Sequence, residues 1–387
     1  MTIKNNYLPS KRSFIEKFFV MDVLSKSRIL EDKGKKVYHL ELGEPINFVP
    51  KKVNLEITKA LHSNLVGYTP SNGIFNLRKK IAQFYKTKDL EVEVNDIFVT
   101  VGSSGAFLLT FLTCFDPGDT VVIFNPSYPA YKNILKSLNI KVIEIEANSE
   151  DNFKIHLDKI KKFKNINGVI ISSPNNPTGQ IFDSNELEFI YKFCKKNKIY
   201  LISDEIYHGI EFDKEAISIR RFGNTAIIIN SFSKFFCLPG WRIGWVILTK
   251  SLRENFLKLT QNLFISTGSI SQIAALKALD CINEYENKVK IYKKNRNFVF
   301  KQLNETPWNK FSHSNGSFYT YINISDYSNN SKELADKILN STGIALTPGI
   351  DFDSKHGHKT LRLSFSNTYI NIEESLIILK NWINKNY

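Results

Sequence analysis

The chain has 387 residues, of which 42% are hydrophobic and 13% aromatic, so it can bury a large core and is not a disordered protein. Its 52 Lys and Arg residues outnumber its 38 Asp and Glu residues by 14, but the lysines are spread along the whole chain. This spacing indicates a charged surface and argues against a nucleic-acid-binding patch.

The four cysteines are far apart and form no CxxC pair. This argues against a zinc ribbon or a disulfide scaffold and favours a reducing, cytoplasmic compartment. The N-terminus has no apolar run followed by a small-residue cleavage site, so no targeting segment is expected. The uncharged window from Phe98 to Cys114 contains a glycine-serine turn and predicts a strand, turn and helix, with no membrane span.

Between about residues 50 and 250, short β-branched runs alternate with amphipathic helical patterns such as residues 185–197. Several of the runs are apolar on both faces, as in a mostly parallel sheet that is covered by helices. The expected strands are IFVTV (97–101), TVVIF (120–124), KVIEI (141–145), GVIIS (168–172), IYLIS (199–203), AIIIN (226–230) and GWVIL (244–248). The pattern predicts an α/β domain with right-handed crossovers.

After Ser269 the pattern predicts a long helical tract to Asn304, interrupted near residues 280–284. An α+β pattern follows, with a strand in 316–324, a helix over 331–343, a strand over 360–366 and a closing helix over 372–385. The chain start is expected to pack with this last segment. The predicted organisation is an N-terminal arm with part of a small domain (1–49), a large α/β domain (50–283) and a C-terminal small domain (284–387).

Polar segments follow four of the expected strands, at the edge where open α/β sheets bind ligands. They are Gly102-Ser103-Ser104-Gly105, Ser173-Pro174-Asn175-Asn176-Pro177-Thr178-Gly179, Asp204-Glu205 with Tyr207 beyond, and Ser231-Phe232-Ser233-Lys234. A glycine-serine turn that leads into a helix presents N–H groups and hydroxyls to an anion, although many ordinary βα turns look the same.

Lys234 stands among aromatic residues in SFSKFFCLPGWRIGW, where desolvation would lower the pKa of its amine and suit it to a Schiff base with a carbonyl. A lysine on an apolar ridge could instead snorkel to water, and Asp204 could be a helix cap. Arg242 adds a cation for a phosphate or a carboxylate. The combination of anion cradle, amine, carboxylate and amide matches the needs of pyridoxal phosphate.

In these motifs the chain resembles the fold-type I pyridoxal-phosphate enzymes, specifically the class I/II aminotransferases of the aspartate and aromatic type. The match runs from HLELGEP (39–45) to TLRLSFS (360–366), and SFSKxxxxPGWRIGW, SPNNPTG and SDEIY are its most specific motifs. The resemblance implies a large domain that binds pyridoxal 5'-phosphate, with a mostly parallel sheet sandwiched by helices, plus a small α+β domain. It places the Schiff-base lysine at Lys234.

The resemblance also implies a role for each matching residue. The catalytic residues would be Lys234, Asp204, which faces the ring nitrogen, and Tyr207. The cofactor ligands would be Ser103, Ser104, Ser231 and Arg242 at the phosphate, with Ser233 a weaker candidate, Asn176 and Tyr207 at the ring oxygen, and Tyr128 on the ring face. The substrate contacts would be Arg362, Gly43 and Asn176, with Asn175 beside them. Tyr68 matches a tyrosine lent to a neighbouring subunit's phosphate site, which implies a homodimer.

The implied reaction moves the amino group of an L-amino acid to a 2-oxo acid, with 2-oxoglutarate the expected acceptor. A C–S lyase, another elimination enzyme or a decarboxylase on the same fold is the alternative. A ligand-sensing regulator on DNA is a further one, but only about 40 residues precede HLELGEP, too few for a DNA-binding domain. The helix over 104–115 and the residues beside Asn175 contain no lysine or arginine that would receive a distal carboxylate. This argues against strict aspartate specificity unless a residue of the partner subunit supplies the cation.

Three other loci have plainer interpretations. His356 and His358 form an HxH pair in a glycine-containing loop, which we interpret as solvated, so no metal is expected. His208 either lines the site or packs behind it. Trp241 and Trp245 are expected to pack behind Arg242.

Overall fold

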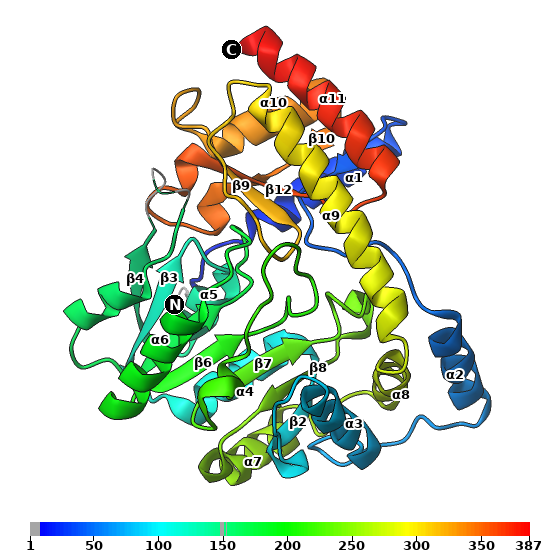
Figure 1. The fold of residues 1–387 in the computed structure, drawn as a ribbon, viewed down its shortest axis with the longest axis vertical. Coiled ribbons are helices and arrows are strands. Elements are labelled where there is room, and N and C mark those ends of the chain that lie inside the picture. The colour runs from blue at the N-terminus through cyan, green and yellow to red at the C-terminus, as the bar shows by residue number, and fades with distance from the viewer. Residues whose placement is uncertain (1–7, 148–150, 152) are drawn as a thin grey trace, which may run out of the picture.

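A seven-stranded sheet forms the centre of the computed structural model, which describes residues 8–147, 151 and 153–387 (Figure 1). Its strands, in the spatial order β2-β8-β7-β6-β5-β3-β4, are β2 (Ile97–Thr100), β8 (Gly244–Ile247), β7 (Ile227–Ser231), β6 (Tyr200–Asp204), β5 (Gly168–Ser172), β3 (Thr120–Asn125) and β4 (Lys141–Glu146). In the described chain β8 runs antiparallel to both of its neighbours, and the other pairs are parallel. The predicted α/β fold with a mostly parallel sheet is confirmed.

Helices cover both faces of this sheet because successive side chains of each strand point to opposite sides. Ile227 and Ile229 belong to a buried cluster with residues of α4 (Gly102–Cys114), α5 (Pro129–Ser137) and α7 (Arg253–Leu263). Ile228, between them, belongs to a second cluster with residues of the helices on the other face. Those helices are α3 (Phe75–Lys86), α6 (Ser184–Asn197) and α8 (Ser269–Ala278).

A smaller, antiparallel sheet has the order β11-β12-β9 and lies at the other end of the molecule, beside α10 and α11 (Figure 1). The chain start reaches this end, where β1 pairs in parallel with β10. The elements are α1 (Phe19–Asp32), β1 (Tyr38–His39), β9 (Tyr319–Asn323), α10 (Ser331–Thr342), β10 (Ile344–Ala345), β11 (Thr347–Pro348), β12 (Thr360–Ser364) and α11 (Tyr369–Asn386).

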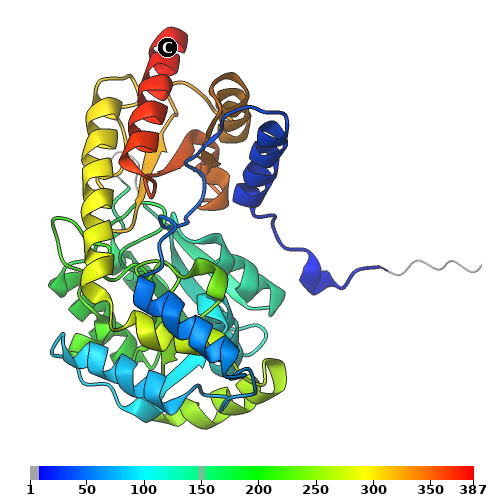
Figure 2. The same ribbon diagram turned by 90° about the vertical axis from the view of Figure 1, so that its right-hand side faces the viewer.

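The remaining helices connect the two ends. Helix α2 (Lys51–His62) packs against α8, and α9 (Ile282–Asn304) runs from the large sheet to the small one (Figures 1 and 2). The expected interruption of the helical tract near 280–284 lies slightly earlier, at residues 279–281. The division of the chain at residues 49 and 283 stays a prediction. Of the helices that the structure describes, none has the length and apolar content needed to cross a membrane.

The strand register brings the predicted polar turns together. Ser172, at the end of β5, pairs with Asp204, at the end of β6, and Asp204 pairs with Ile229 of β7. Ser231, at the end of β7, lies opposite Gly244 of β8. Because these parallel strands end at one edge, the segments that follow them face a common space.

Candidate active site

A cavity of about 560 Å³ lies where the turns after the large-sheet strands meet residues 42–44 and strands β9 and β12. Most of the predicted site residues line it, namely Gly43, Ser103, Ser104, Tyr128, Asn176, Asp204, Tyr207, Lys234, Arg242 and Arg362. Phe18, Val20 and Met21, at the beginning of α1, line it as well. Segments that are far apart in the chain therefore build one site.

Lys234 reaches into the cavity from the turn that follows β7. Its Nζ donates a hydrogen bond of 2.5 Å to the carbonyl oxygen of Gly43 and lies 5.8 Å from the centre of the Tyr207 ring. Desolvation lowers the pKa of this amine to about 8, with a contribution from the guanidinium groups of Arg362 and Arg242. Part of the Lys234 amine population is therefore uncharged near neutral pH, and the uncharged amine is the nucleophilic form.

Asp204 is the last residue of β6, and its carboxylate is buried in the wall of the cavity. The Tyr131 hydroxyl donates to its Oδ2, and the backbone N–H of Ile206 donates to its Oδ1 at 3.1 Å. Desolvation raises the pKa of this carboxyl to about 6, although these hydrogen bonds and the charge of Lys234 oppose the shift. A cationic ligand group beside Asp204 would further favour its ionised form.

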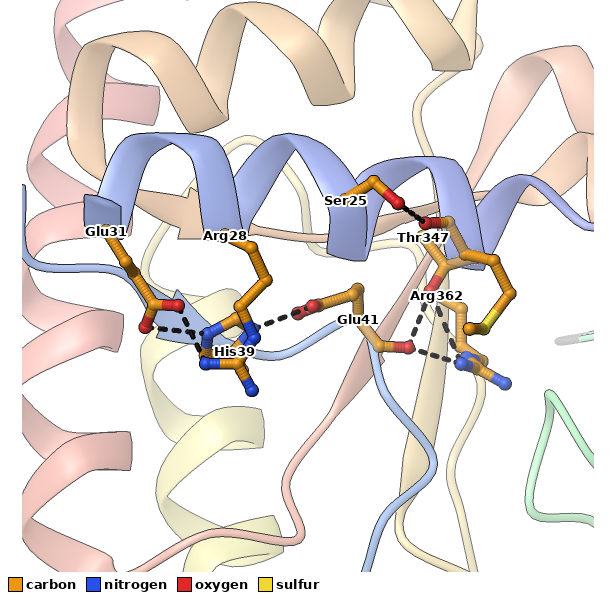
Figure 3. Close-up of polar contacts among 8 residues, drawn as sticks. Ser25, Arg28, Glu31, His39, Glu41, Thr347 and Arg362 are labelled. Atoms are coloured by element: carbon orange, nitrogen blue, oxygen red, sulfur yellow. Dashed lines mark hydrogen bonds and ion pairs between the residues drawn. The ribbon is translucent and has the colours of Figure 1, made fainter. Parts of the chain in front are cut away.

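Arg362 lies on β12, and its guanidinium is buried between the rings of Tyr319 and Phe352, 4.2 and 4.6 Å from their centres. Nη1 donates to Oδ1 of Asn176 at 2.9 Å. Nη2 donates to the backbone carbonyl of Glu41 and, at 3.3 Å, to Oγ1 of Thr347 (Figure 3). Neutral oxygens thus hold the cation, and its Nε has no partner among the described residues. The site can accept a carboxylate.

An anion cradle lies at the start of α4, where Ser103 and Ser104 line the cavity beside Arg242. Gly102 adopts φ +65°, and a Cβ there would lie 2.7 Å from Nη2 of Arg242, so glycine permits this close approach. Backbone N–H groups of a helix start, two hydroxyls and a guanidinium form a suitable site for a phosphate.

Several predicted residues lie outside the residues that line the cavity. Ser231 is buried behind the lining residue Ser233, and its Oγ donates to that hydroxyl at 2.9 Å. Asn175 accepts hydrogen bonds from the backbone and hydroxyl of Thr178, which shapes the loop. Tyr68 is 86% exposed in the single chain.

His208 and Trp245 lie behind the site. The His208 Nε2 is 3.0 Å from the backbone oxygen of Ser173. The buried Trp245 ring packs 4.9 Å from the ring of Phe232, centre to centre.

Other residues of the site were not among the sequence predictions. Tyr131 and Tyr319 line the cavity and contact Asp204 and Tyr207 respectively. Tyr131 stands at helical spacing from Tyr128, a signal that could have indicated it. Tyr319 lies in an expected strand that carries no motif. Phe18, Met21 and Glu44 also line the cavity.

Comparison with known proteins identifies the family. The model of the family "Aminotransferase class I and II" matches residues 35–375. The chain is 39% identical to the (5-formylfuran-3-yl)methyl phosphate transaminase of Methanocaldococcus jannaschii, over 96% of this chain and 98% of that one. It is 34% identical to the valine–pyruvate aminotransferase of Mycobacterium tuberculosis, over 96% and 97%.

Solved structures agree with this result. A crystal structure of an aminotransferase from Mycobacterium tuberculosis superposes with a TM-score of 0.94 at 34% identity, covering 98% of this chain and 99% of that one. The aspartate aminotransferase of Thermus thermophilus with maleate superposes with a TM-score of 0.91 at 26% identity, covering 97% and 99%. The chain belongs to the class I and II aminotransferases and is a transaminase that uses pyridoxal 5'-phosphate.

The residues of the cavity fit this cofactor. The cofactor has an aldehyde, a basic ring nitrogen, a ring oxygen and a phosphate. The cavity offers the amine of Lys234, the buried carboxylate of Asp204, the phenol of Tyr207 and the cradle at the start of α4. A buried arginine Nε without a hydrogen-bond partner in the described chain belongs to Arg362, on the substrate side.

Proposed function

We propose that this cavity transfers the amino group of an L-amino acid to a 2-oxo acid through Lys234, with 2-oxoglutarate as the acceptor. The observation that carries the proposal is the placement of Lys234, Asp204 and Arg362 around one cavity. An amine with a pKa of about 8, a buried carboxylate and a guanidinium that is bound by neutral oxygens in the described chain are the groups that transamination needs.

The proposed ligands of the cofactor follow from the same geometry. Lys234 Nζ would bind its aldehyde carbon covalently, and Asp204 would face its ring nitrogen. The remaining contacts would come from Tyr207 and Asn176 at the ring oxygen, Tyr128 at the ring face, and Ser103, Ser104, Ser233 and Arg242 at the phosphate, with Ser231 behind them. When bound, the cofactor supplies an electron sink for the charge that develops at the substrate Cα.

The chain's own residues would then bind the substrate and move protons. Arg362 would bind the α-carboxylate through its Nε and Nη groups, which fixes the substrate Cα relative to Lys234. In its uncharged form Lys234 Nζ would remove the Cα proton, and its pKa of about 8 suits a base that works near neutral pH. Asp204 would keep a proton on the ring nitrogen by its negative charge.

The covalent role of Lys234 is tested by borohydride reduction of the holoenzyme followed by peptide mapping. The label should fall on Lys234, and Lys234→Ala should lose it together with turnover. Lys132→Ala is the matched control, because Lys132 is also largely covered but pairs with Glu144 outside this cavity. A label on another lysine would refute the proposal.

The acceptor is tested separately. The cations that line the cavity in the described chain are Lys234, Arg242 and Arg362, and each already has a proposed role. The second carboxylate of 2-oxoglutarate would therefore have to be bound by a residue of the neighbouring subunit. A panel of donors run with 2-oxoglutarate, with pyruvate and with no acceptor tests this. Turnover that requires 2-oxoglutarate supports the proposal. Turnover with pyruvate but not with 2-oxoglutarate would show that the acceptor is pyruvate. Release of ammonia without any acceptor would indicate an elimination enzyme.

We further propose a cytoplasmic homodimer in which each subunit lends Tyr68 to the other's phosphate site. Several exposed apolar side chains lie close to Tyr68 in the sequence, at the end of α2, in the segment between α2 and α3, and at the start of α3; they are Leu61, Leu65, Val66 and Phe75. So many large exposed apolar residues in one short stretch favour a subunit interface. All four cysteines are free thiols, which supports a reducing compartment.

Subunit mixing tests the dimer. Lys234→Ala and Tyr68→Ala should each be nearly inactive, but their mixture should regain about a quarter of the wild-type sites, because half of the dimers would be mixed and each would hold one intact site. Activity no greater than the sum of the two separate variants would contradict the exchange.

A further inference from the structure

Tyr319 occupies a central position between the proposed cofactor and substrate contacts. It lies on β9 of the small sheet and is buried, and its side chain lines the cavity. In the ladder between β9 and β12, Tyr319 pairs with Ser364 and Tyr321 pairs with Arg362. Tyr319 and Arg362 are thus diagonal neighbours on adjacent strands, a relationship in which long side chains meet.

The two ends of the Tyr319 side chain contact different groups. Its hydroxyl oxygen lies 2.8 Å from the hydroxyl oxygen of Tyr207. Its ring lies under the guanidinium of Arg362, 4.2 Å from ring centre to Cζ. The hydroxyl also fills the space beside Gly43, where a Cβ would lie 1.8 Å from it. One side chain therefore contacts Tyr207, Arg362 and the backbone segment whose carbonyl accepts from Lys234.

We propose that Tyr319 is a positioning residue that donates its hydroxyl proton to Tyr207, so that the Tyr207 proton points to the cofactor's ring oxygen, while its ring supports Arg362. The proposal rests on the proposed roles of Tyr207 and Arg362. It couples the cofactor side of the cavity, which belongs to the large sheet, to the substrate side, which belongs to the small sheet.

The direction of the hydrogen bond follows from proton counting. Burial raises the pKa of the Tyr319 phenol, and the pKa of Tyr207 lies well above its ordinary value, so both hydroxyls keep their protons. Only one proton can lie between the two oxygens. If Tyr207 donates to the ring oxygen, Tyr319 must donate to Tyr207, and hydrogen bonds in such a chain strengthen one another.

Tyr319→Phe tests the hydroxyl, because it keeps the ring and its contact with Arg362. A weaker hydrogen bond at the ring oxygen should raise the pH at which the visible absorbance band of the bound cofactor titrates, by roughly half a pH unit to one unit. The matched control is Tyr321→Phe. Tyr321 lies on the same strand and is equally buried, but its hydroxyl bonds to Gly349 and Thr360. Its titration should equal that of the wild type.

A double variant tests whether Tyr319 acts through Tyr207. Tyr207→Phe should shift the titration at least as far as Tyr319→Phe, and Tyr207→Phe/Tyr319→Phe should shift it no further. If Tyr207→Phe shifts the titration but Tyr319→Phe does not, the inference is wrong and the proposed role of Tyr207 still holds. The same conclusion follows if the shifts add in the double variant. No shift in Tyr207→Phe would refute the proposed role of Tyr207 itself, and the inference with it.

Tyr319→Leu tests the ring. The KM of the amino donor should stay near the wild-type value in Tyr319→Phe and rise about 10-fold in Tyr319→Leu, because the guanidinium loses an aromatic face. Circular dichroism and cofactor titration should show that Tyr319→Leu is folded and loaded. Equal KM values in the two variants would contradict the claim that the Tyr319 ring supports Arg362. If Tyr319→Leu does not fold, Tyr319→Met is used in its place, with the same expected KM.

Discussion

The hydroxyl of Tyr131, on α5, donates a hydrogen bond to Oδ2 of Asp204, at the end of β6. Burial and the negative charge of Asp204 keep the pKa of the Tyr131 phenol well above its ordinary value, so Tyr131 remains a donor. The hydrogen bond favours the ionised form of Asp204 and opposes the desolvation that raises its pKa. Tyr131 thus supports the charge that the proposed chemistry requires.

Tyr131→Phe should lower kcat about 10-fold, because the pKa of Asp204 rises further when the donor is lost. Protonation then removes the charge at a higher pH, so the acidic limb of the kcat profile should move to higher pH. Tyr191→Phe is the control, since the buried Tyr191 hydroxyl has no hydrogen-bond partner in the part of the chain that is described. An unmoved acidic limb would contradict the role of Tyr131.

Arg362→Lys should raise the KM of the amino donor roughly 10-fold to 100-fold, with a smaller effect on cofactor binding. Lysine keeps the charge but cannot form the two parallel hydrogen bonds to a carboxylate. Steady-state kinetics and a cofactor titration would measure both effects. Arg253→Lys is a matched control, because Arg253 pairs with Asp96 outside the cavity. A KM for Arg362→Lys as low as that for Arg253→Lys would contradict the proposed binding of the substrate carboxylate by Arg362.

Gly43→Ala should destabilise the protein by about 1–3 kcal/mol and lower its activity. The new methyl group would lie 1.8 Å from the Tyr319 hydroxyl, so either Tyr319 or the segment 42–44 must shift. Gly268→Ala should change the free energy of unfolding little, since the nearest described atom to a Cβ there is the Ser271 Oγ at 3.6 Å, an ordinary van der Waals distance. Thermal unfolding and activity would be compared, and equal behaviour of the two variants would contradict this packing.

His39 should make stability depend on pH. Its Nδ1 lies 2.8 Å from the buried Glu41 and its Nε2 lies 3.1 Å from Glu31, which also binds Arg28 (Figure 3). The hydrogen bond to Glu41 raises the pKa of His39 above 6.5, against the effect of desolvation, and Glu31 adds to the increase. The folded state therefore holds the proton more tightly than the unfolded state.

The resulting stabilisation is complete below a pH of about 6.5 and is lost as the pH rises through the higher, folded-state pKa. His39→Gln should lower Tm by roughly 2–5 °C at pH 6 and by less at pH 9. His156→Gln, which removes a partly exposed contact with Asp151, should show little difference at either pH. A Tm difference between wild type and His39→Gln that grows with pH would contradict a raised pKa of His39 in the folded state.

Much of the fold could be predicted because its signals are local. Alternating β-branched runs and amphipathic patterns identified the strands of the large sheet, and the comparisons confirm the family and the α/β class. The ends of parallel strands meet at one edge, so the turns that carry Asn176, Asp204 and Lys234 were expected to converge before any contact was known. The structure brings these residues into one cavity.

The sequence by itself determined which strands are followed by polar turns and which residue types are available there to bind the cofactor, because both depend on short segments. Only the tertiary structure decided which side chains support them. Arg362 is held by the carbonyl of Glu41, 321 positions away, and Tyr319 meets Tyr207 across 112 positions. The first contact depends on the chain start joining the small-sheet end, and the second depends on how the small sheet packs on the large one. The same packing buries Asp204 and raises the pKa of its carboxyl, which short segments do not specify.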